Sequence, residues 1–255
     1  MSGTLTPEQV EHYQTQGFVN RIPIFTPDEA GRWLARLEDL ERAELDRRGG
    51  DWKDRDFRPW VTDDHPMFAW ANELVRTPAL LDAVESLLGP DILVRNADIF
   101  VKNPGLRRDI GWHVDTAEKG ADADQLLTVW LGLTESTRKN GCILYSAGTH
   151  RREIPNGPKD KHSLTFTREA IASLRPQDTA LNEMEAGMCS MHHFRIAHAS
   201  GPNRSDARRI GFVVRFMSPD IQPETAESGA ATVVRGSDRR GRFHLRDKFP
   251  MTWTM

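Results

Sequence analysis

A histidine and an aspartate two positions apart, in the stretch Gly-Trp-His-Val-Asp (111–115), are the residues of this chain best suited to metal chemistry. On a β-strand, residues i and i+2 point to the same face, so His113 and Asp115 could both reach one metal ion. Two donors do not complete a metal site. Among 9 histidines and 37 acidic residues in 255 positions, about one His-x-Asp/Glu pair is expected by chance. The alternative is therefore a histidine and an aspartate that both lie at the surface.

Six histidines downstream of this pair are candidates for the third ligand. His198 ends an apolar stretch and is followed at once by a Gly-Pro-Asn turn (201–203) that leads into another predicted strand. A hairpin of this kind can place His198 over the mouth of a barrel. His192 and His193 are its competitors, but adjacent residues of a strand face opposite ways, so at most one of the two points inward.

Two arginines share one face of the strand predicted for residues 208–217, whose other face is fully apolar. In a closed barrel this first face looks into the lumen, where a guanidinium needs a carboxylate. No acidic residue of the strand supplies one, so Arg209 is a candidate for binding a carboxylate from outside the protein in a bidentate manner. Arg215, if it faces inward, could hold a carboxylate or phosphate of a substrate. The alternative for both is an edge strand with solvated arginines.

The apolar strand predicted for residues 126–133 offers a second pair of lumen-facing side chains. Its apolar residues at 127, 129, 131 and 133 share one face, so Thr128 and Trp130 lie on the other. Both could line the same lumen. Because a tryptophan is more often a packing residue than a cofactor contact, both interpretations of Trp130 stay open.

The composition is that of an ordinary soluble protein. The 255 residues fit one large domain or two small ones, and 38% apolar and 28% charged residues are typical of globular chains. A net charge of −3 without long runs of one sign gives no indication of a nucleic-acid partner. Two cysteines fit a reducing cytosol, and neither a signal peptide nor a membrane-spanning stretch is recognisable. We expect a cytoplasmic protein without membrane partners, and the composition leaves its oligomeric state undetermined.

Helical signals fill the first ninety residues and strand patterns follow. Thr6 and Thr26 each precede a proline and have Gln or Glu at the third helical position, which predicts two helix starts. Further helices are predicted near 67–76, 77–88 and 168–174, and strands at 92–101, 110–115, 126–133, 142–145, 180–185, 188–193 and 208–217, with a possible edge strand at 231–235. Many strands after a helical lead-in predict a β-sandwich or barrel with helices packed outside.

Several short motifs follow one another in a distinctive order. His113-x-Asp115 comes after a strand that runs into Lys-Asn-Pro-Gly (102–105), and it is followed by Thr-Val-Trp-Leu (128–131), Asn-Gly-Cys (140–142), Ala-Gly-Thr-His (147–150) and His-x-Ser-Gly-x-Asn-x-Ser (198–205) with Arg209. Over about residues 6–217 this order resembles the phytanoyl-CoA dioxygenase family of Fe(II)/2-oxoglutarate oxygenases. The distance from His198 to Arg209, 209 − 198 = 11 residues, is similar to that of the family. Each motif alone is weak, and their order and spacing together are specific.

The resemblance implies a fold and a metal site. The family fold is a double-stranded β-helix, a jelly-roll or cupin-like barrel that is mainly β with flanking helices. We expect it as a single domain over residues 1–255, with a helical lead-in to about 90, the barrel over about 91–217 and a tail from about 218. By resemblance, His113, Asp115 and His198 are the iron ligands. Such a triad of two histidines and one carboxylate suits Fe(II) and leaves three coordination positions open.

The resemblance also implies how the cosubstrate is bound. Arg209 would pair with the distal carboxylate of 2-oxoglutarate, and Ser200 would form a hydrogen bond to it. Lys102 and Trp130 occupy positions at which family members contact the cosubstrate. Asn96 occupies a position at which some members touch substrate. The histidine at 150 belongs to a structural turn in the family, so we do not expect it to be a ligand.

The implied activity is that of an Fe(II)/2-oxoglutarate-dependent dioxygenase. It would use O2 to hydroxylate an unactivated C–H bond of a small molecule, an amino acid or a specialised metabolite, with succinate and CO2 as coproducts. Asp115 favours hydroxylation over halogenation, because related halogenases have a small residue at this position. Epimerisation, desaturation or ring formation, a non-catalytic metal-binding barrel and a zinc-dependent hydrolase or isomerase stay as alternatives. Residues 51–65 and the tail past Pro219 are candidates for a lid.

Overall fold

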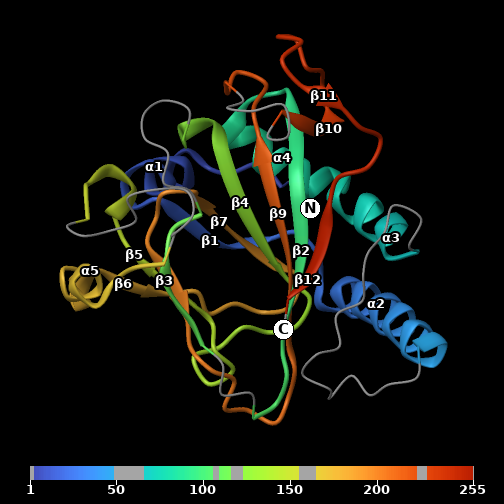
Figure 1. Ribbon diagram of the computed structural model, residues 1–255, viewed down its shortest axis with the longest axis horizontal. Helices are drawn as coiled ribbons and strands as arrows, with labels where there is room; N and C mark the ends of the chain where they lie inside the picture. Colours follow the sequence, from blue (N-terminus) through green and yellow to red (C-terminus); the bar gives the residue numbers. More distant parts are fainter. Residues whose placement is uncertain are drawn as a thin grey trace.

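Two β-sheets face each other, and four helices from the first part of the chain cover the outer face of the larger sheet (Figure 1). The computed structural model describes residues 3–48, 66–105, 109–115, 123–154, 165–222 and 229–254. Side chains from both sheets pack against one another in the space between them.

The helices begin where the sequence predicts them to begin. Thr6 accepts a hydrogen bond from the backbone N–H of Gln9, and the Gln9 side chain accepts one from the Thr6 N–H. Thr26 and Glu29 form the same reciprocal cap. The four helices are α1 (Pro7–Gln16), α2 (Pro27–Arg48), α3 (Pro66–Val75) and α4 (Pro78–Leu88).

The larger sheet contains eight strands in the order β1-β7-β4-β9-β2-β10-β11, with β12 also paired to β2. The pairs from β1 to β10 are antiparallel, and the pairs β10–β11 and β2–β12 are parallel. The strands are β1 (Phe18–Pro23), β2 (Ile92–Lys102), β4 (Leu126–Gly132), β7 (Met188–His193), β9 (Arg209–Met217), β10 (Ala230–Arg235), β11 (His244–Leu245) and β12 (Met251–Thr254).

The smaller sheet is antiparallel and contains four strands in the order β3-β8-β5-β6. These strands are β3 (Ile110–His113), β8 (His198–Ser200), β5 (Ile143–Ser146) and β6 (Thr179–Leu181). The remaining short elements are α5 (Arg168–Ala172) and the 3-10 turns η1 (Ala123–Gln125), η2 (Thr149–Arg151) and η3 (Pro176–Asp178).

The alternation of side chains along β4 and β9 confirms the predicted inner and outer faces. The outer residues of these strands join the core beneath the helices, where Phe212 packs edge-on against Trp70 at 5.3 Å between ring centroids. Inner residues such as Thr128 and Val213 line a cavity between the sheets. Burial of the apolar outer face against α3 and α4 therefore fixes which side chains of β4 and β9 reach the cavity.

A register shift in β2 between Val94 and Asn96 keeps the inner faces of β2 and β9 together. Before the shift, Leu93 lies opposite Met217, and after it Asn96 lies opposite Arg215. A bulge of this kind moves the inward face of the strand by one residue. Without it, the residues of β2 that follow would turn from the cavity to the helical core.

The described part of the C-terminal tail extends the larger sheet. The strand predicted at 231–235 is present as β10, but it lies between β2 and β11 and not at the edge of the sheet. β12, which the sequence did not predict, pairs with β2 beside residues 97–100. The tail was also a candidate for a lid. Its described strands are instead part of the larger sheet, in which β10 and β12 pair with β2 and β11 pairs with β10. Residues 51–65, the other candidate, lie outside the described residues. Within the described ranges no helix has the length and apolarity needed to cross a bilayer.

Candidate metal centre and cosubstrate pocket

The predicted metal ligands His113, Asp115 and His198 come together at the edge of the smaller sheet. His113 ends β3 and lies directly opposite His198, the first residue of β8, with 4.0 Å between the ring centroids. Asp115 follows two residues after His113. One donor atom from each of the three side chains lies within 4.8 Å of the others, and no other described residues form such a group. His198 thus lies within a paired strand, whereas the sequence predicted a hairpin over the barrel mouth.

Backbone carbonyls orient both imidazoles of this triad. The Nδ1 of His113 lies 2.8 Å from the carbonyl oxygen of Gly111, and the Nδ1 of His198 lies 3.0 Å from that of Ile196. Each Nδ1–H is the donor, so each Nε2 keeps its lone pair for a metal. Burial and the neighbouring His113 hold the pKa of His198 well below its usual range. His198 is therefore neutral, as a ligand must be.

The Asp115 carboxylate is held by hydrogen bonds from two strands of the larger sheet. Its Oδ2 accepts from the Thr128 hydroxyl at 2.7 Å and from Nε2 of His192 at 3.3 Å. His192 in turn has its Nδ1 3.1 Å from the Tyr145 hydroxyl, which donates to it. Burial raises the pKa of Asp115, but the hydrogen bond from His192 and the Arg215 guanidinium outweigh burial and hold it well below its usual range. Asp115 is therefore ionised and held in one orientation, as a metal ligand must be.

The sequence did not assign His192 this supporting role. It named His192 and His193 as competitors for the third ligand position and predicted that at most one would point inward. His192 does point into the cavity. His193 faces the other way and has its Nε2 3.0 Å from Oδ1 of Asp124. A supporting histidine leaves no signal of its own in the sequence, because its partner Asp115 is 77 positions away.

Arg209 is a buried cation without a carboxylate partner among the described residues. Its side chain is 1% exposed, its Nη1 donates to the Gly141 carbonyl, and its Nε has no hydrogen-bond partner. The guanidinium carbon lies 5.2 Å from the centre of the Trp130 ring. Burial lowers the pKa of Arg209 to about 10, so it is still charged at neutral pH. An unpaired buried charge is costly, and a bound anion would satisfy it.

Ser200 lines the cavity at the same end as Arg209, and Lys102, which does not itself line the cavity, donates a hydrogen bond to Ser200. Lys102 is the register partner of Arg209 across β2 and β9. Its Nζ donates to the Ser200 hydroxyl at 2.7 Å and to the carbonyls of Ser200 and Gly201. Burial, followed by the charge of Arg209, lowers the pKa of Lys102 to about 7. Two basic side chains therefore lie next to each other at this end, and Arg209 is the one that lines the cavity.

Gly211 determines how Trp130 lies in the cavity. A Cβ atom built on Gly211 would lie 2.2 Å from ring atoms of Trp130, a distance that no side chain can adopt. The indole therefore lies across β9 where the strand has no side chain, and this position brings the ring to Arg209. The sequence alone gives no reason to single out Gly211, because a glycine within a strand indicates close approach only once the neighbouring strand is known.

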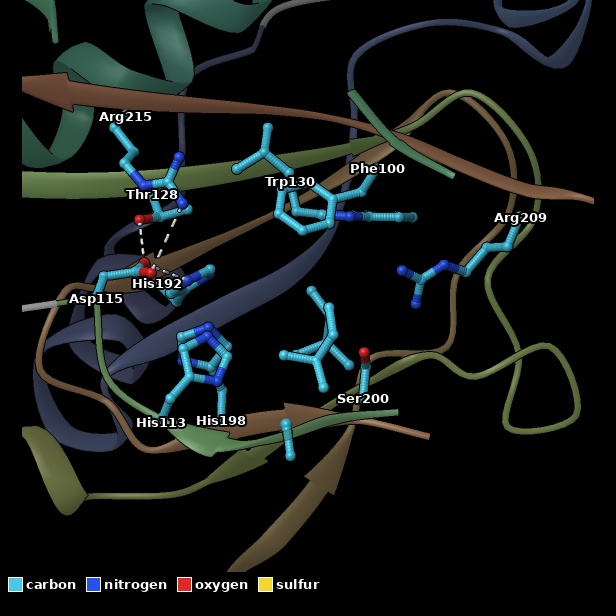
Figure 2. A pocket seen from close by; sticks show the side chains of 14 residues that line it. Phe100, His113, Asp115, Thr128, Trp130, His192, His198, Ser200, Arg209 and Arg215 are labelled. Carbon is cyan, nitrogen blue, oxygen red and sulfur yellow. Dashed lines mark hydrogen bonds and ion pairs between the residues drawn. The ribbon is translucent and has the colours of Figure 1, made fainter. Parts of the chain in front are cut away.

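Arg215 reaches the other end of the cavity, next to the metal triad. Figure 2 shows Arg215 beside Asp115 and Arg209 near Ser200, with Trp130 between the two ends. Arg215 forms an ion pair with Asp98 of β2, and its Nη2 lies 3.8 Å from Oδ1 of Asp115. Burial raises the pKa of Asp98, and Arg215 opposes this rise. The predicted role of Arg215 toward a substrate stays a prediction.

The cavity itself has mixed walls, with both polar and apolar side chains. Its apolar residues are Phe100, Ile110, Trp130, Ile143, Ala199 and Val213. Asn96, the other residue predicted to touch substrate, lies opposite Arg215 in the sheet but is not among the residues that line the cavity. A metal triad and a free guanidinium thus open onto one small, largely apolar space.

Sequence comparison assigns the chain to a family. The profile of the family described as phytanoyl-CoA dioxygenase (PhyH) matches residues 13–211. The chain belongs to this family. The match covers both sheets of the barrel up to Gly211 in β9, and it therefore includes all three triad residues and Arg209.

Individual members of the PhyH family and a solved structure are similar over most of the chain. A probable alpha-ketoglutarate-dependent hypophosphite dioxygenase of Stutzerimonas stutzeri is 25% identical, over 85% of this chain and 80% of its own length. An ectoine dioxygenase of Streptomyces anulatus is 24% identical, over 91% and 84%. The structure of the non-heme monooxygenase ThoJ has a TM-score of 0.75 and 29% identity, over 94% and 88%. The predicted family, barrel fold and enzyme class are confirmed, whereas the roles of individual residues stay predictions.

Proposed function

We propose that this PhyH-family enzyme is an Fe(II)/2-oxoglutarate-dependent dioxygenase that hydroxylates an unactivated C–H bond of a small molecule. The observation that carries the proposal is the buried, carboxylate-free guanidinium of Arg209, which opens onto the same cavity as the histidine–aspartate–histidine triad. A triad alone is compatible with many metal enzymes. A triad with an anion site in the same cavity is suited to a cosubstrate that both chelates the metal and carries a distant carboxylate.

The triad residues would hold Fe(II) through Nε2 of His113, Nε2 of His198 and the Asp115 carboxylate. Two histidines and one carboxylate on one side of the ion leave positions for a chelating ligand and O2. When bound, the iron supplies the oxidising chemistry that couples decarboxylation of the 2-oxo acid to substrate oxidation. Thr128 and His192 keep Asp115 in one orientation and ionised.

Four side chains would hold 2-oxoglutarate. Arg209 pairs with the distal carboxylate, the Ser200 hydroxyl forms a hydrogen bond to it, and the Lys102 ammonium adds a second positive charge. The Trp130 ring lies next to the guanidinium, and both residues are almost fully buried. Exclusion of water strengthens the ion pair and protects the oxidising centre from side reactions. The cosubstrate would thus be oriented before the substrate arrives.

The relatives do not select a substrate. Their names refer to ectoine and to hypophosphite, two molecules with little in common. Small-molecule oxidation is therefore the level at which similarity supports the proposal. Hydroxylation is the favoured outcome because Asp115 occupies the position at which related halogenases have a small residue, and O2-dependent epimerisation, desaturation or ring closure would use the same residues.

Anaerobic addition of Fe(II) and 2-oxoglutarate tests the proposal without a known substrate. The two ligands should together produce a weak visible charge-transfer band, which neither Fe(II) alone nor Zn(II) with 2-oxoglutarate produces. On admission of O2, slow release of succinate should follow. A protein that binds Fe(II) without the band or succinate release would be a non-catalytic metal-binding barrel.

A further inference from the structure

We propose that the end of the cavity beside Arg215 accepts an uncharged, oxygen-bearing part of the substrate, and that Asp98 sets this selectivity. The inference rests on the proposed function and names the class of substrate for the same site. It concerns the part of the substrate that lies next to the metal triad, where Arg215 enters the cavity (Figure 2).

The first observation is that the charge of Arg215 already has a partner within the protein. Asp98 forms an ion pair with Nη1 of Arg215, and the Asp98 side chain is 8% exposed. The two residues lie on neighbouring strands, because Asp98 is two positions from Asn96, the register partner of Arg215. Such a diagonal pair lies within reach of a long side chain on the inner face of a sheet.

The second observation is that Asp98 itself does not line the cavity, whereas Arg215 does. A substrate therefore meets the guanidinium and not the carboxylate behind it. Asp98 acts through Arg215 as a positioning residue. It holds the guanidinium against the wall of β2 and cancels its net charge.

A substrate carboxylate would be poorly accommodated at this end. It would meet one guanidinium that is shared between Asp98 and the Asp115 carboxylate, whose Oδ1 lies 3.8 Å from Nη2. A substrate carboxylate would meet a guanidinium whose charge Asp98 already balances, so the cost of removing that carboxylate from water would not be recovered. A substrate ammonium would in turn face Arg215 at close range. A neutral group meets neither penalty.

Arg215 still has hydrogen-bond donors to offer. A guanidinium carries five N–H donors, and the only hydrogen bond from Arg215 to another described residue goes to Asp98. The distance of 3.8 Å to Asp115 is too long for another. The remaining donors suit a carbonyl, hydroxyl or ether oxygen. Because Val213, two residues before Arg215 on the inner face of β9, also lines the cavity, the carbon framework that carries this oxygen is expected to be apolar.

A library of matched compounds tests this selectivity. Each scaffold is supplied both as the carboxylic acid and as the primary amide, which have nearly the same shape and differ in charge. The measurement is succinate release above the rate without added compound. With the wild-type enzyme, stimulation should come from amides and not from the matching acids. Preference for acids, or no stimulation by either member of any pair, would contradict the proposal.

Substitution of Asp98 sharpens the test. Asp98→Asn keeps the shape, removes the negative charge and leaves Arg215 with an unbalanced charge. The ratio of acid-stimulated to amide-stimulated succinate release should rise by at least about tenfold, the effect of roughly 1.4 kcal/mol. The matched control is Asp91→Asn, which makes the same change in a carboxylate that pairs with Arg239 outside the cavity. This control should leave the ratio unchanged.

A double variant guards against a folding defect in Asp98→Asn. Asp98→Asn with Arg215→Gln removes both charges at once, and the preference for amides should return. An unchanged ratio in Asp98→Asn, or an acid preference in the double variant, would overturn the inference. The charge-transfer band separates this failure from that of the proposed function. A wild-type protein without the band disproves the proposed function, whereas a band with an unaltered ratio disproves only the role of Asp98.

Discussion

Arg209 and Arg215 occupy the same face of β9, six residues or roughly 20 Å apart along the strand, yet they have opposite surroundings. Arg209 is buried, lacks a carboxylate partner among the described residues and has an unsatisfied Nε. Arg215 is 21% exposed on its side chain and is paired with Asp98, with Asp115 nearby. Identical residues on one strand therefore have different chemistry, and the difference comes from the neighbouring strand.

β2 supplies that difference through its register with β9. It places Lys102 directly opposite Arg209 and Asp98 within reach of Arg215. One end of the cavity consequently has a buried arginine with a lysine beside it, which suits an anionic cosubstrate. At the other end, the charge of Arg215 is balanced by Asp98. The metal triad lies toward the balanced end, where the substrate would have to approach (Figure 2).

Removal of Asp115 should have the largest effect, because this residue belongs to both the triad and the surroundings of Arg215. Asp115→Ala deletes one of three metal ligands and leaves Arg215 with Asp98 alone. Turnover of 2-oxoglutarate should fall to background, and the affinity for Fe(II) should fall, measured by titration with the anaerobic charge-transfer band. Full succinate release from Asp115→Ala would show that the metal binds elsewhere.

Arg209→Ala tests the end of the cavity at which the arginine has no carboxylate partner among the described residues. Loss of a buried charge pair costs about 2–5 kcal/mol of binding, which corresponds to roughly 30-fold to several thousand-fold weaker binding of 2-oxoglutarate. The apparent dissociation constant can be read from the same band at rising cosubstrate concentration.

The matched variant for Arg209→Ala is Arg215→Ala on the same strand face. If the two arginines differ as described, Arg215→Ala should leave the affinity for 2-oxoglutarate within about threefold of wild type, a change of less than 1 kcal/mol. Equal losses in both variants would mean that the two ends are not distinct, and an unchanged affinity in Arg209→Ala would remove the assignment of the cosubstrate site.

Patterns within a single strand were sufficient to predict much of this site. Alternation placed Arg209, Arg215, Thr128 and Trp130 on inner faces, and the fold bears this out because the opposite faces must be buried under the helices. The order of motifs identified the family and the barrel fold, and the spacing of His113 and Asp115 indicated the triad. These are local features, which the chain carries regardless of its neighbours.

Features that depend on pairing between strands could not be read from the sequence. Because β9 contains no acidic residue, the sequence correctly predicted that Arg209 has no partner within its own strand. It could not predict the pairing of Arg215 with Asp98, which lies 117 positions away. The role of His192 depends on the path of residues 113–115, and that of Gly211 depends on Trp130 of the adjacent strand. Register, including the bulge in β2, determines the first and the last of these contacts.

Gly211→Ala should moderately lower the stability of the protein and its affinity for 2-oxoglutarate, because it disturbs only the end of the cavity at Arg209. The new methyl group would overlap the Trp130 ring, and overpacking of this kind typically costs about 1–3 kcal/mol. We expect a lower melting temperature and weaker binding of 2-oxoglutarate, because the displaced indole moves toward Arg209. The double variant with Trp130→Phe makes room for the methyl group and should recover part of the stability. Full wild-type affinity in Gly211→Ala would mean that Trp130 does not shape the cosubstrate site.

The smallest predicted effect concerns pH and Lys102, the group that makes the Arg209 end doubly cationic. Its pKa of about 7 in the free site means that the amine is protonated below pH 7 and increasingly neutral above it. A dianion bound nearby favours the charged form and raises this pKa, so that binding above pH 7 takes up a proton.

The affinity for 2-oxoglutarate should therefore be constant below pH 7 and fall above it by up to about tenfold per pH unit, until the pKa of the complex is reached. Titration calorimetry in buffers of different ionisation enthalpy measures the proton uptake directly. Lys102→Met should bind more weakly at pH 6 and lose the pH dependence, because no proton is then exchanged. If the wild-type affinity did not change between pH 6 and 9, Lys102 would not take part in cosubstrate binding, and the contrast between the two ends of the cavity would rest on Arg209 alone.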